Sequence, residues 1–223
     1  ESESYRDLIR QASLIPSVTT YEGKHIGFYA DFVTRKDEQI LMKSGISFTS
    51  LKNAEENLYA EIKGWDFDET HETCVRLWDK ELSKITVTGG TEDEKKIFYT
   101  AMYHTLIDPR ICSDVNGEYW GADNRIHQTK KFDKRTIFSG WDVFRSQMPL
   151  QTLINPTVVN DLINSLVEIA EQSGNEYLER WELLNAYSGC MLGNPAISIL
   201  CDAYTKGIRD YDVEKAYHYA LNT

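Results

Sequence analysis

The residues best suited to chemistry in this chain begin with Trp141 and Asp142, which lie in the run FSGWDVFR. An indole ring can stack on the C–H face of a pyranose, and a carboxylate can accept hydrogen bonds from two sugar hydroxyls. This pair therefore indicates a sugar-binding surface at the start of a helix. The structural alternative is that Trp141 belongs to the core and Asp142 caps its helix, and the residue types alone leave both open.

A second tryptophan–acid pair, Trp181-Glu182, lies in the run ERWELL. Two such pairs are typical of a cleft lined with aromatic rings and carboxylates, which is the usual composition of a sugar site. Glu182 could equally form a structural ion pair with Arg145 or Arg180, so this second pair also has two explanations.

An oxygen-rich patch between residues 114 and 133 consists of Asp114, Asn116, Glu118, Asp123 and Asp133. Carboxylate and amide oxygens are the ligands that calcium prefers. The spacing does not match an EF-hand loop, so we expect a solvated hairpin here, with calcium binding as the alternative. We assign no metal ligand from this patch.

The four cysteines, Cys74, Cys112, Cys190 and Cys201, show no CxxC spacing, and the five histidines are scattered. This distribution predicts no zinc site. Free cysteines are often buried in folded proteins, so we expect buried free thiols, with disulfides as the alternative.

Composition and missing motifs exclude several classes of function. The net charge of −11 argues against a nucleic-acid surface, because phosphate binding needs clustered Lys and Arg. No apolar run approaches the roughly 18 residues of a membrane span. The chain has no Gly-rich phosphate loop, nucleophile elbow or HExxH, so kinase, serine hydrolase and zinc protease functions have no support. A neutral, hydroxyl-rich ligand remains compatible with this composition.

The elements that must position these residues fall into two regions. In the first 60 or so residues, β-branched and aromatic runs such as GKHIGFYADF and QILMKSGISFTSL predict strands, and residues 53–61 predict a short helix. From Asp66 the pattern becomes helical. A first helix begins at Asp66 with Glu69 as its capping partner, and the linker it forms ends at Gly89-Gly90.

Later helix starts recur at Thr91 with Glu94, and at Ser139. Pro149 is expected to kink or end the helix that Ser139 begins. Between these helices, Asn116-Gly117 predicts the turn of a hairpin, because both residues tolerate positive φ.

Three more helices complete the chain. Asn155-Pro156 and Asn194-Pro195 each place Asn as N-cap and Pro at the first helical position, and Asp212 begins a last helix that runs toward Thr223. Helix after helix with short connections predicts a helical toroid or bundle that continues past Thr223.

Six segments resemble glycoside hydrolase family 92, and they occur in order over most of the chain. They are KSGISFTSLKNAEENLYAEIKGWDFD (43–68), GGTEDEKKIFYTAMYHTL (89–106), SDVNGEYWG (113–121), FSGWDVFRSQMPLQTLINP (138–156), RWELLNAYSGCMLGNPA (180–196) and DAYTKGIRDYDVEKAY (202–217). Several segments are long, so the resemblance is specific.

The resemblance implies an α+β multidomain fold. Residues 1–65 would be the end of an N-terminal β-sandwich, residues 66–90 a helical linker, and residues 91–223 the first part of an (α/α)6 catalytic barrel. This agrees with the strand–linker–helix order derived from the residues.

The resemblance also implies the activity, which is the removal of terminal α-linked mannose from glycans by calcium-assisted inverting hydrolysis. Trp141, Asp142, Trp181 and Glu182 match the family's sugar-binding positions. The catalytic acid and base and the calcium ligands are expected beyond residue 223, so the chain alone should be inactive. One departure is Glu179, where the family pattern has proline.

The remaining expectations follow from the resemblance and the composition together. The resemblance alone implies mannose-containing glycans as partners and an extracytoplasmic location, either periplasmic or secreted, whereas the net charge argues against nucleic acid. The alternatives are another (α/α)6 glycosidase or phosphorylase, or a non-catalytic glycan-binding module. Linkage preference and oligomeric state are left open.

Overall fold

The computed structural model describes residues 13–223, and the chain forms two units, Glu1–Ile40 and Leu41–Thr223. Residues 13–40 of the first unit contain turns but no helix or strand. The second unit carries every element named below.

The predicted strands before residue 51 are absent from the part of the chain that the structure describes. The runs at residues 23–32 and 39–50 have no strand, and large side chains there are exposed, such as Phe28 at 93% and Met42 at 81%. A strand is stable only beside a hydrogen-bonded neighbour, and residues 13–50 find none within the described chain. A local enrichment in β-branched and aromatic residues was therefore not enough to predict strands in these two runs. The β-sandwich itself stays a prediction.

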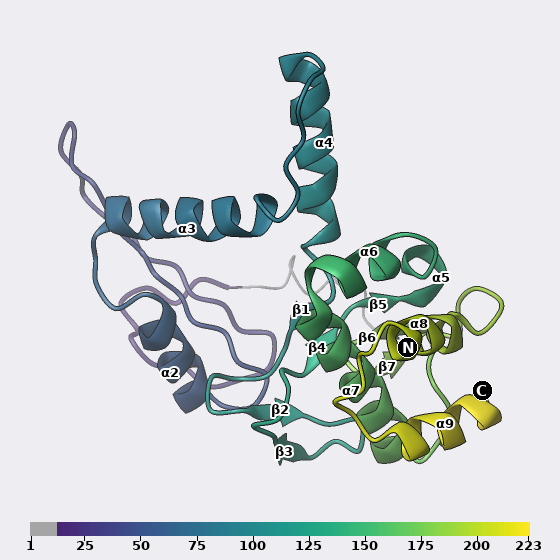
Figure 1. Cartoon of the computed structure of the whole chain (residues 1–223). Coiled ribbons are helices and arrows are strands. Elements are labelled where there is room, and N and C mark those ends of the chain that lie inside the picture. Colours follow the sequence, from purple (N-terminus) through teal and green to yellow (C-terminus); the bar gives the residue numbers. More distant parts are fainter. Residues whose placement is uncertain (1–12) are drawn as a thin grey trace. The chain divides into compact units, whose positions relative to one another are not determined.

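The second unit combines helices with short antiparallel strands (Figure 1). The helices are α2 (Leu51–Glu61), α3 (Phe67–Leu82), α4 (Glu92–Thr105), α5 (Gly140–Val143), α6 (Gln147–Ile154), α7 (Pro156–Gln172), α8 (Pro195–Thr205) and α9 (Val213–Asn222). The strands are β1 (Arg110–Ile111), β2 (Glu118–Trp120), β3 (Ile126–Gln128), β4 (Arg135–Thr136), β5 (Phe138–Ser139), β6 (Trp181–Leu183) and β7 (Ala186–Tyr187). They pair as β1-β4, β2-β3 and β5-β6-β7.

Most predicted helix starts are confirmed, because capping is a local interaction. The Asp66 side chain accepts a hydrogen bond from the Glu69 amide, and Asp212 caps α9 in the same way. Thr91 and Glu94 form the complete capping box of α4. Pro156 and Pro195 begin α7 and α8 as predicted, although neither preceding asparagine makes a side-chain cap bond.

Two local predictions are wrong. Pro149 neither kinks nor ends the helix that follows Ser139, because α5 ends at Val143 and Pro149 lies in the first turn of α6. Proline is tolerated there, since first-turn amides have no acceptor within the helix. Asn116-Gly117 forms a tight turn closed by a bond from the Gly117 amide to the Asp114 carbonyl, but the β2–β3 hairpin reverses later, at residues 121–125.

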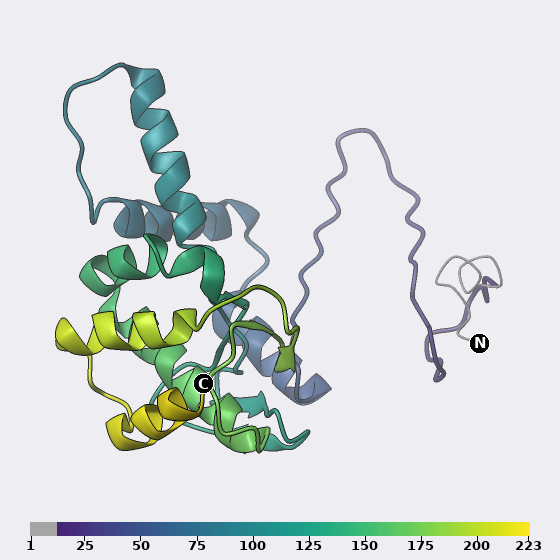
Figure 2. The same cartoon turned by 90° about the vertical axis from the view of Figure 1, so that its right-hand side faces the viewer.

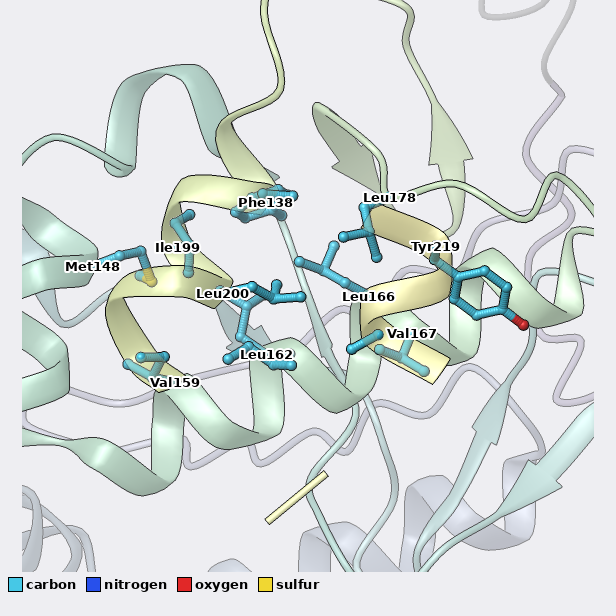
Figure 3. Close-up of a cluster of buried hydrophobic side chains, with 14 of the residues drawn as sticks. Phe138, Met148, Val159, Leu162, Leu166, Val167, Leu178, Ile199, Leu200 and Tyr219 are labelled. Carbon is cyan, nitrogen blue, oxygen red and sulfur yellow. The ribbon is translucent and has the colours of Figure 1, made fainter. Parts of the chain in front are cut away.

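The core is built around α7, which contacts α6, α8 and α9. Figure 2 shows α6, α8 and α9 one below another, in green to yellow. Leu162, Leu166 and Ile169 on α7 are each 1% exposed, as their helical spacing predicts. Phe138 and Leu178 reach the same cluster from outside the helices (Figure 3). Each such side chain stabilises the fold by about 1.5–3 kcal/mol.

The helices α3 and α4 touch through Trp78 and Tyr103, whose ring centroids lie 4.6 Å apart. No residue of α3 is buried, so this pair depends little on core packing. Within the described residues, no helix has the length and apolar character required to cross a membrane.

Candidate functional site

The two tryptophan–acid pairs lie side by side, because β5 and β6 are neighbours in one sheet. Ser139 lies opposite Trp181, and Phe138 lies opposite Glu182. The contact continues past the strand end, where the Gly140 amide donates to the Arg180 carbonyl at 3.0 Å. Trp141 and Asp142 follow Gly140 directly, so the start of α5 lies at the start of β6.

Gly140 is required for this close approach. A Cβ at this position would lie 2.7 Å from the Arg180 carbonyl oxygen and 2.7 Å from the Phe138 ring. Both distances are shorter than those that real Cβ atoms show. The Arg180 oxygen belongs to the backbone, so it cannot move aside as the end of a flexible side chain could. The glycine of the run FSGWD therefore allows the second chain segment to lie against the first.

Alternation along the strands divides the four predicted residues between two faces. Side chains of successive strand residues point to opposite sides of a sheet. Phe138 and Glu182 share the buried face, each with 1% of its surface exposed. Ser139 and Trp181 share the other face, which is partly open. Asp142 belongs to the open face too, because its carboxylate contacts the Ser139 hydroxyl.

The structural alternatives for Trp141 and Asp142 are wrong for the described chain, while sugar binding by the two residues stays a prediction. Trp141 is 38% exposed and so is not a core residue. Asp142 is exposed and lies within the first turn of α5, where its carboxylate accepts from the Ser139 hydroxyl and caps no backbone amide. The Arg145 guanidinium lies 4.8 Å from the centre of the Trp141 ring, so one face of that ring already carries a cation. Both residues remain available to a ligand.

Glu182 has a different environment. Its carboxylate accepts hydrogen bonds from the Thr136 hydroxyl at 2.9 and 3.1 Å and from the backbone N–H of Asn185 at 2.6 Å. The expected ion-pair alternative is wrong for the described chain, since neither candidate arginine bonds Glu182. Arg180 instead donates to the Tyr187 hydroxyl and the Met191 carbonyl. Direct binding of a sugar hydroxyl by Glu182 stays a prediction.

A buried group of charges lies on this inner side of β6. Lys134 is fully buried, and its ammonium makes two long hydrogen bonds, to the Arg135 carbonyl at 3.4 Å and the Asn185 side-chain oxygen at 3.3 Å, and lies 5.9 Å from the centre of the Tyr119 ring. Burial lowers the pKa of Lys134, while nearby acidic groups including Glu182 oppose the change. Burial raises the pKa of Glu179 to about 7, and repulsion from Glu182 adds to this. The Oε2 atom of Glu179 has no hydrogen-bond partner.

The oxygen-rich patch does not form one site. The Asp114 carboxylate is occupied by donors from the segment before and within α2: Ser47, Thr49, Asn53 and Asn57. Although burial raises the pKa of Asp114, these hydrogen bonds outweigh it and lower the pKa overall. Asp123 instead bonds His127 at 2.9 Å. Residues 13–223 hold no group of three His, Cys, Asp or Glu side chains arranged for a metal ion, and the calcium of the resemblance stays a prediction.

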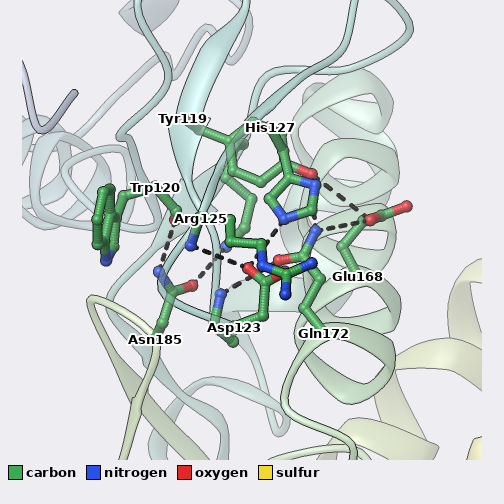
Figure 4. Close-up of polar contacts among 10 residues, drawn as sticks. Tyr119, Trp120, Asp123, Arg125, His127, Glu168, Gln172 and Asn185 are labelled. Carbon is green, nitrogen blue, oxygen red and sulfur yellow. Dashed lines mark hydrogen bonds and ion pairs between the residues drawn. The ribbon is translucent and has the colours of Figure 1, made fainter. Parts of the chain in front are cut away.

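The β2–β3 hairpin is attached to α7 by a polar network (Figure 4). Gln172 donates to the Tyr119 hydroxyl at 3.0 Å and to Glu168 at 3.0 Å. Tyr119 stacks on His127, with ring centroids 5.7 Å apart. Burial raises the pKa of Tyr119 to about 12, so its hydroxyl keeps its proton. The network fixes Trp120, whose carbonyl accepts from Asn185 at 2.7 Å.

The cysteines are free, as expected, but most are not buried. Cys74, Cys190 and Cys201 are exposed, and Cys112 is only partly exposed. The prediction of buried thiols is therefore wrong for three of the four, because they lie on outward faces and in loops rather than in the core around α7. Burial raises the pKa of Cys112 to about 11.

Residues 41–223 contain two cavities, neither of which is lined by Trp141, Asp142, Trp181 or Glu182. One of about 360 Å³ is lined by residues of α3, α6 and α7, including Trp78 and Gln151. The other, of about 200 Å³, is lined by Phe48, Cys112, Trp120, Leu184 and Asn185. The surface around Trp141 and Asp142 is thus distinct from both cavities.

Comparison with known proteins decides the family. The model of the glycosyl hydrolase family 92 catalytic domain matches residues 53–223. The chain belongs to glycoside hydrolase family 92. A comparison with curated proteins found no match.

Solved structures of family 92 enzymes resemble the chain closely. The GH92 alpha-mannosidase BT3965 from Bacteroides thetaiotaomicron is 33% identical with a TM-score of 0.75, over 79% of this chain and 24% of that one. That enzyme also matches in its complex with mannoimidazole. The inverting mannosidase BT2199 of the same organism is 30% identical with a TM-score of 0.72, over 78% of this chain and 23% of that one. The chain spans about a quarter of the length of these structures.

Some residues around the site were missed by sequence reasoning. Lys134 and Thr136 support Glu182 and Asn185, yet the run KKFDKRTIF is rich in charge and was assigned no role. The available signal was their spacing of two, which places both side chains on one face of a strand.

Proposed function

We propose that this chain is the sugar-recognition part of a family 92 glycoside hydrolase that removes terminal α-linked mannose from glycans. The observation that carries the proposal is the β5–β6 pairing, in which Ser139 lies opposite Trp181 and the exposed residues Trp141 and Asp142 follow closely after Ser139 at the start of α5. Membership of the family and the mannosidase activity named for two relatives support the substrate. The mannoimidazole complex of one relative is consistent with it.

In this proposal, Asp142 accepts hydrogen bonds from two hydroxyls of the terminal mannose. The free face of Trp141 and the ring of Trp181 provide apolar surfaces for the C–H groups of the sugar. The Ser139 hydroxyl orients the Asp142 carboxylate by donating to it. Glu182 holds β6 from its inner side and is the remaining candidate for a hydroxyl contact.

The chemical step belongs to the whole enzyme. We propose an inverting reaction, in which an acid and a base stand roughly 6.5–9.5 Å apart on either side of the scissile bond. Both carboxylates, and the ligands of a calcium ion, are proposed to lie outside this chain. The fold proposed for the whole enzyme is an N-terminal β-sandwich, a helical linker and an (α/α)6 barrel, and its proposed location is extracytoplasmic.

The test is the Asp142→Asn variant of the full-length enzyme, which keeps the shape of the side chain and removes its charge. Asparagine keeps one neutral acceptor oxygen and replaces the other oxygen by an NH2 donor. Hydrogen bonds to a charged group contribute about 1.5–3 kcal/mol and neutral ones about 1 kcal/mol, so losing one bond and weakening the other predicts a fall in kcat/KM of about 100-fold on an α-mannoside. Asp79→Asn, on the exposed surface of α3, is the matched control and should behave as wild type.

Two results would contradict the proposal. Turnover of Asp142→Asn within threefold of wild type would remove Asp142 from the site. Activity of the wild type on α-glucosides but not on α-mannosides would assign the enzyme to another (α/α)6 glycosidase. Assays with and without a calcium chelator test the proposed role of the ion separately.

A further inference from the structure

The turn that joins β6 to β7 has a conformation that its residues do not favour. Leu183 pairs with Ala186, so Leu184 and Asn185 form a two-residue turn, with φ angles of +49° and +64°. Turns of this type prefer Asn-Gly, because both positions need positive φ. Asparagine tolerates that region, but a bulky residue such as leucine rarely does. A strained backbone persists only where its surroundings hold it in place.

Four hydrogen bonds hold this turn. The Leu184 amide donates to the Thr136 hydroxyl at 2.8 Å, and the Asn185 amide donates to Glu182 at 2.6 Å. The Asn185 side chain donates to the Trp120 carbonyl at 2.7 Å, a contact visible in Figure 4, and accepts from the Lys134 ammonium at 3.3 Å. Every polar atom of the Asn185 side chain therefore has a partner.

Thr136 and Lys134 make these contacts from one side of the same chain segment. They are separated by one residue, so they share a face, and they are 1% and 0% exposed. The residue between them, Arg135, points the other way and bonds Asp161 at 3.1 Å. The arrangement places a hydroxyl and an ammonium directly beneath β6.

The Thr136 hydroxyl has two tasks that no apolar side chain can perform. It accepts from the Leu184 amide and at the same time donates to the Glu182 carboxylate. A hydroxyl is both donor and acceptor, so one atom links the strand β6 to the turn that follows it. Valine has the same shape but would leave the Leu184 amide and Glu182 without this partner.

The Lys134 amino group lies on the same side of β6, where it donates to the Asn185 side-chain oxygen. Glu179 and Glu182 both belong to the segment that carries Trp181, and both are buried near this ammonium. A buried charge is costly unless an opposite charge accompanies it. The Lys134 amino group is thus the basic group that accompanies these two carboxylates, and it also bonds Asn185.

We propose that Lys134 and Thr136 are positioning residues of the sugar site. Through their hydrogen bonds they keep Glu182 and the strained turn in position. They thereby fix the position of β6, the strand that carries Trp181 next to the segment with Trp141 and Asp142. Neither touches the sugar; both act through β6. This inference rests on the proposed function for its effect on sugar binding, and on the hydrogen bonds above for its effect on β6.

The experiment compares Thr136→Val with Thr136→Ser in the full-length enzyme. Serine keeps the bridging hydroxyl and valine keeps the shape. We expect Thr136→Val to raise KM for an α-mannoside about tenfold, because it removes both hydrogen bonds of the Thr136 hydroxyl, and Thr136→Ser to stay within threefold of wild type. Lys134→Met should raise KM at least as much as Thr136→Val. Val167→Ala, a core variant on α7, is the control for simple destabilisation and should lower Tm without changing KM.

A second measurement needs no sugar. Hydrogen exchange of the segment 181–187 should accelerate at least tenfold in Thr136→Val and Lys134→Met, but not in Thr136→Ser or Val167→Ala. If Thr136→Val lowers Tm while leaving both KM and this exchange unchanged, its role is only structural and the inference is wrong. If exchange accelerates but the wild type does not cleave or bind α-mannosides, the positioning of β6 stands and the proposed function fails.

Discussion

Glu179 provides a stability change whose sign and pH range follow from the structure. The side chain is 3% exposed, and burial together with repulsion from Glu182 raises its pKa from 4.5 to about 7. Below pH 4.5 the carboxyl is protonated in both the folded and the unfolded chain, so it does not change the free energy of unfolding. Between pH 4.5 and about pH 7 the unfolded chain releases the proton while the folded chain keeps it. Above about pH 7 the folded chain carries the full cost of a buried carboxylate.

The size of that cost follows from the shift. One pKa unit corresponds to about 1.36 kcal/mol, so the ionised Glu179 destabilises the folded state by about 3 kcal/mol above pH 7. Glu179→Gln keeps the shape and cannot ionise. It should therefore raise the free energy of unfolding by up to about 3 kcal/mol at pH 8 and leave it nearly unchanged at pH 4.5.

Thermal unfolding of the full-length wild type and of Glu179→Gln at the two pH values measures this difference. For a cooperative unit of about 150–250 residues, about 3 kcal/mol corresponds to a rise in Tm of roughly 6–12 °C at pH 8. Glu55→Gln, which changes an exposed carboxylate on α2, is the matched control and should show no such pH dependence. A Tm difference for Glu179→Gln that is equal at both pH values would refute the reasoning, because a neutral packing change does not titrate.

Three further predictions concern stability and reactivity. Thr91→Ala removes the capping box of α4 and should lower the free energy of unfolding by about 1 kcal/mol, whereas Thr91→Ser should not; equal Tm values for the two variants would contradict the cap. Leu166→Ala should cost about 2–5 kcal/mol in chemical denaturation, against less than about 0.5 kcal/mol for the exposed Leu153→Ala. Because burial raises the pKa of Cys112 to about 11, alkylation at pH 8 followed by peptide mapping should modify it last, after the three exposed cysteines.

Local interactions were predictable from the sequence alone. The helices that begin after Asp66, Thr91 and Asp212 begin there because a side chain bonds an amide three residues later, and both partners lie within one turn. The buried faces of α7 and α8 follow from helical periodicity in the same way. The family resemblance, carried by long ordered segments, was also contained in the sequence, and the family match over residues 53–223 confirms it.

Only the tertiary structure decided which residues share a surface. The sequence contains two tryptophan–acid pairs, but the pairing of Ser139 with Trp181 joins segments about forty residues apart, and no local rule predicts such a contact. The same pairing turns Glu182 inward to Thr136 and leaves Asp142 on the open face. The strand-like runs before residue 51 fail for a related reason, because a strand depends on a partner elsewhere in the chain, whereas a helix satisfies its own backbone.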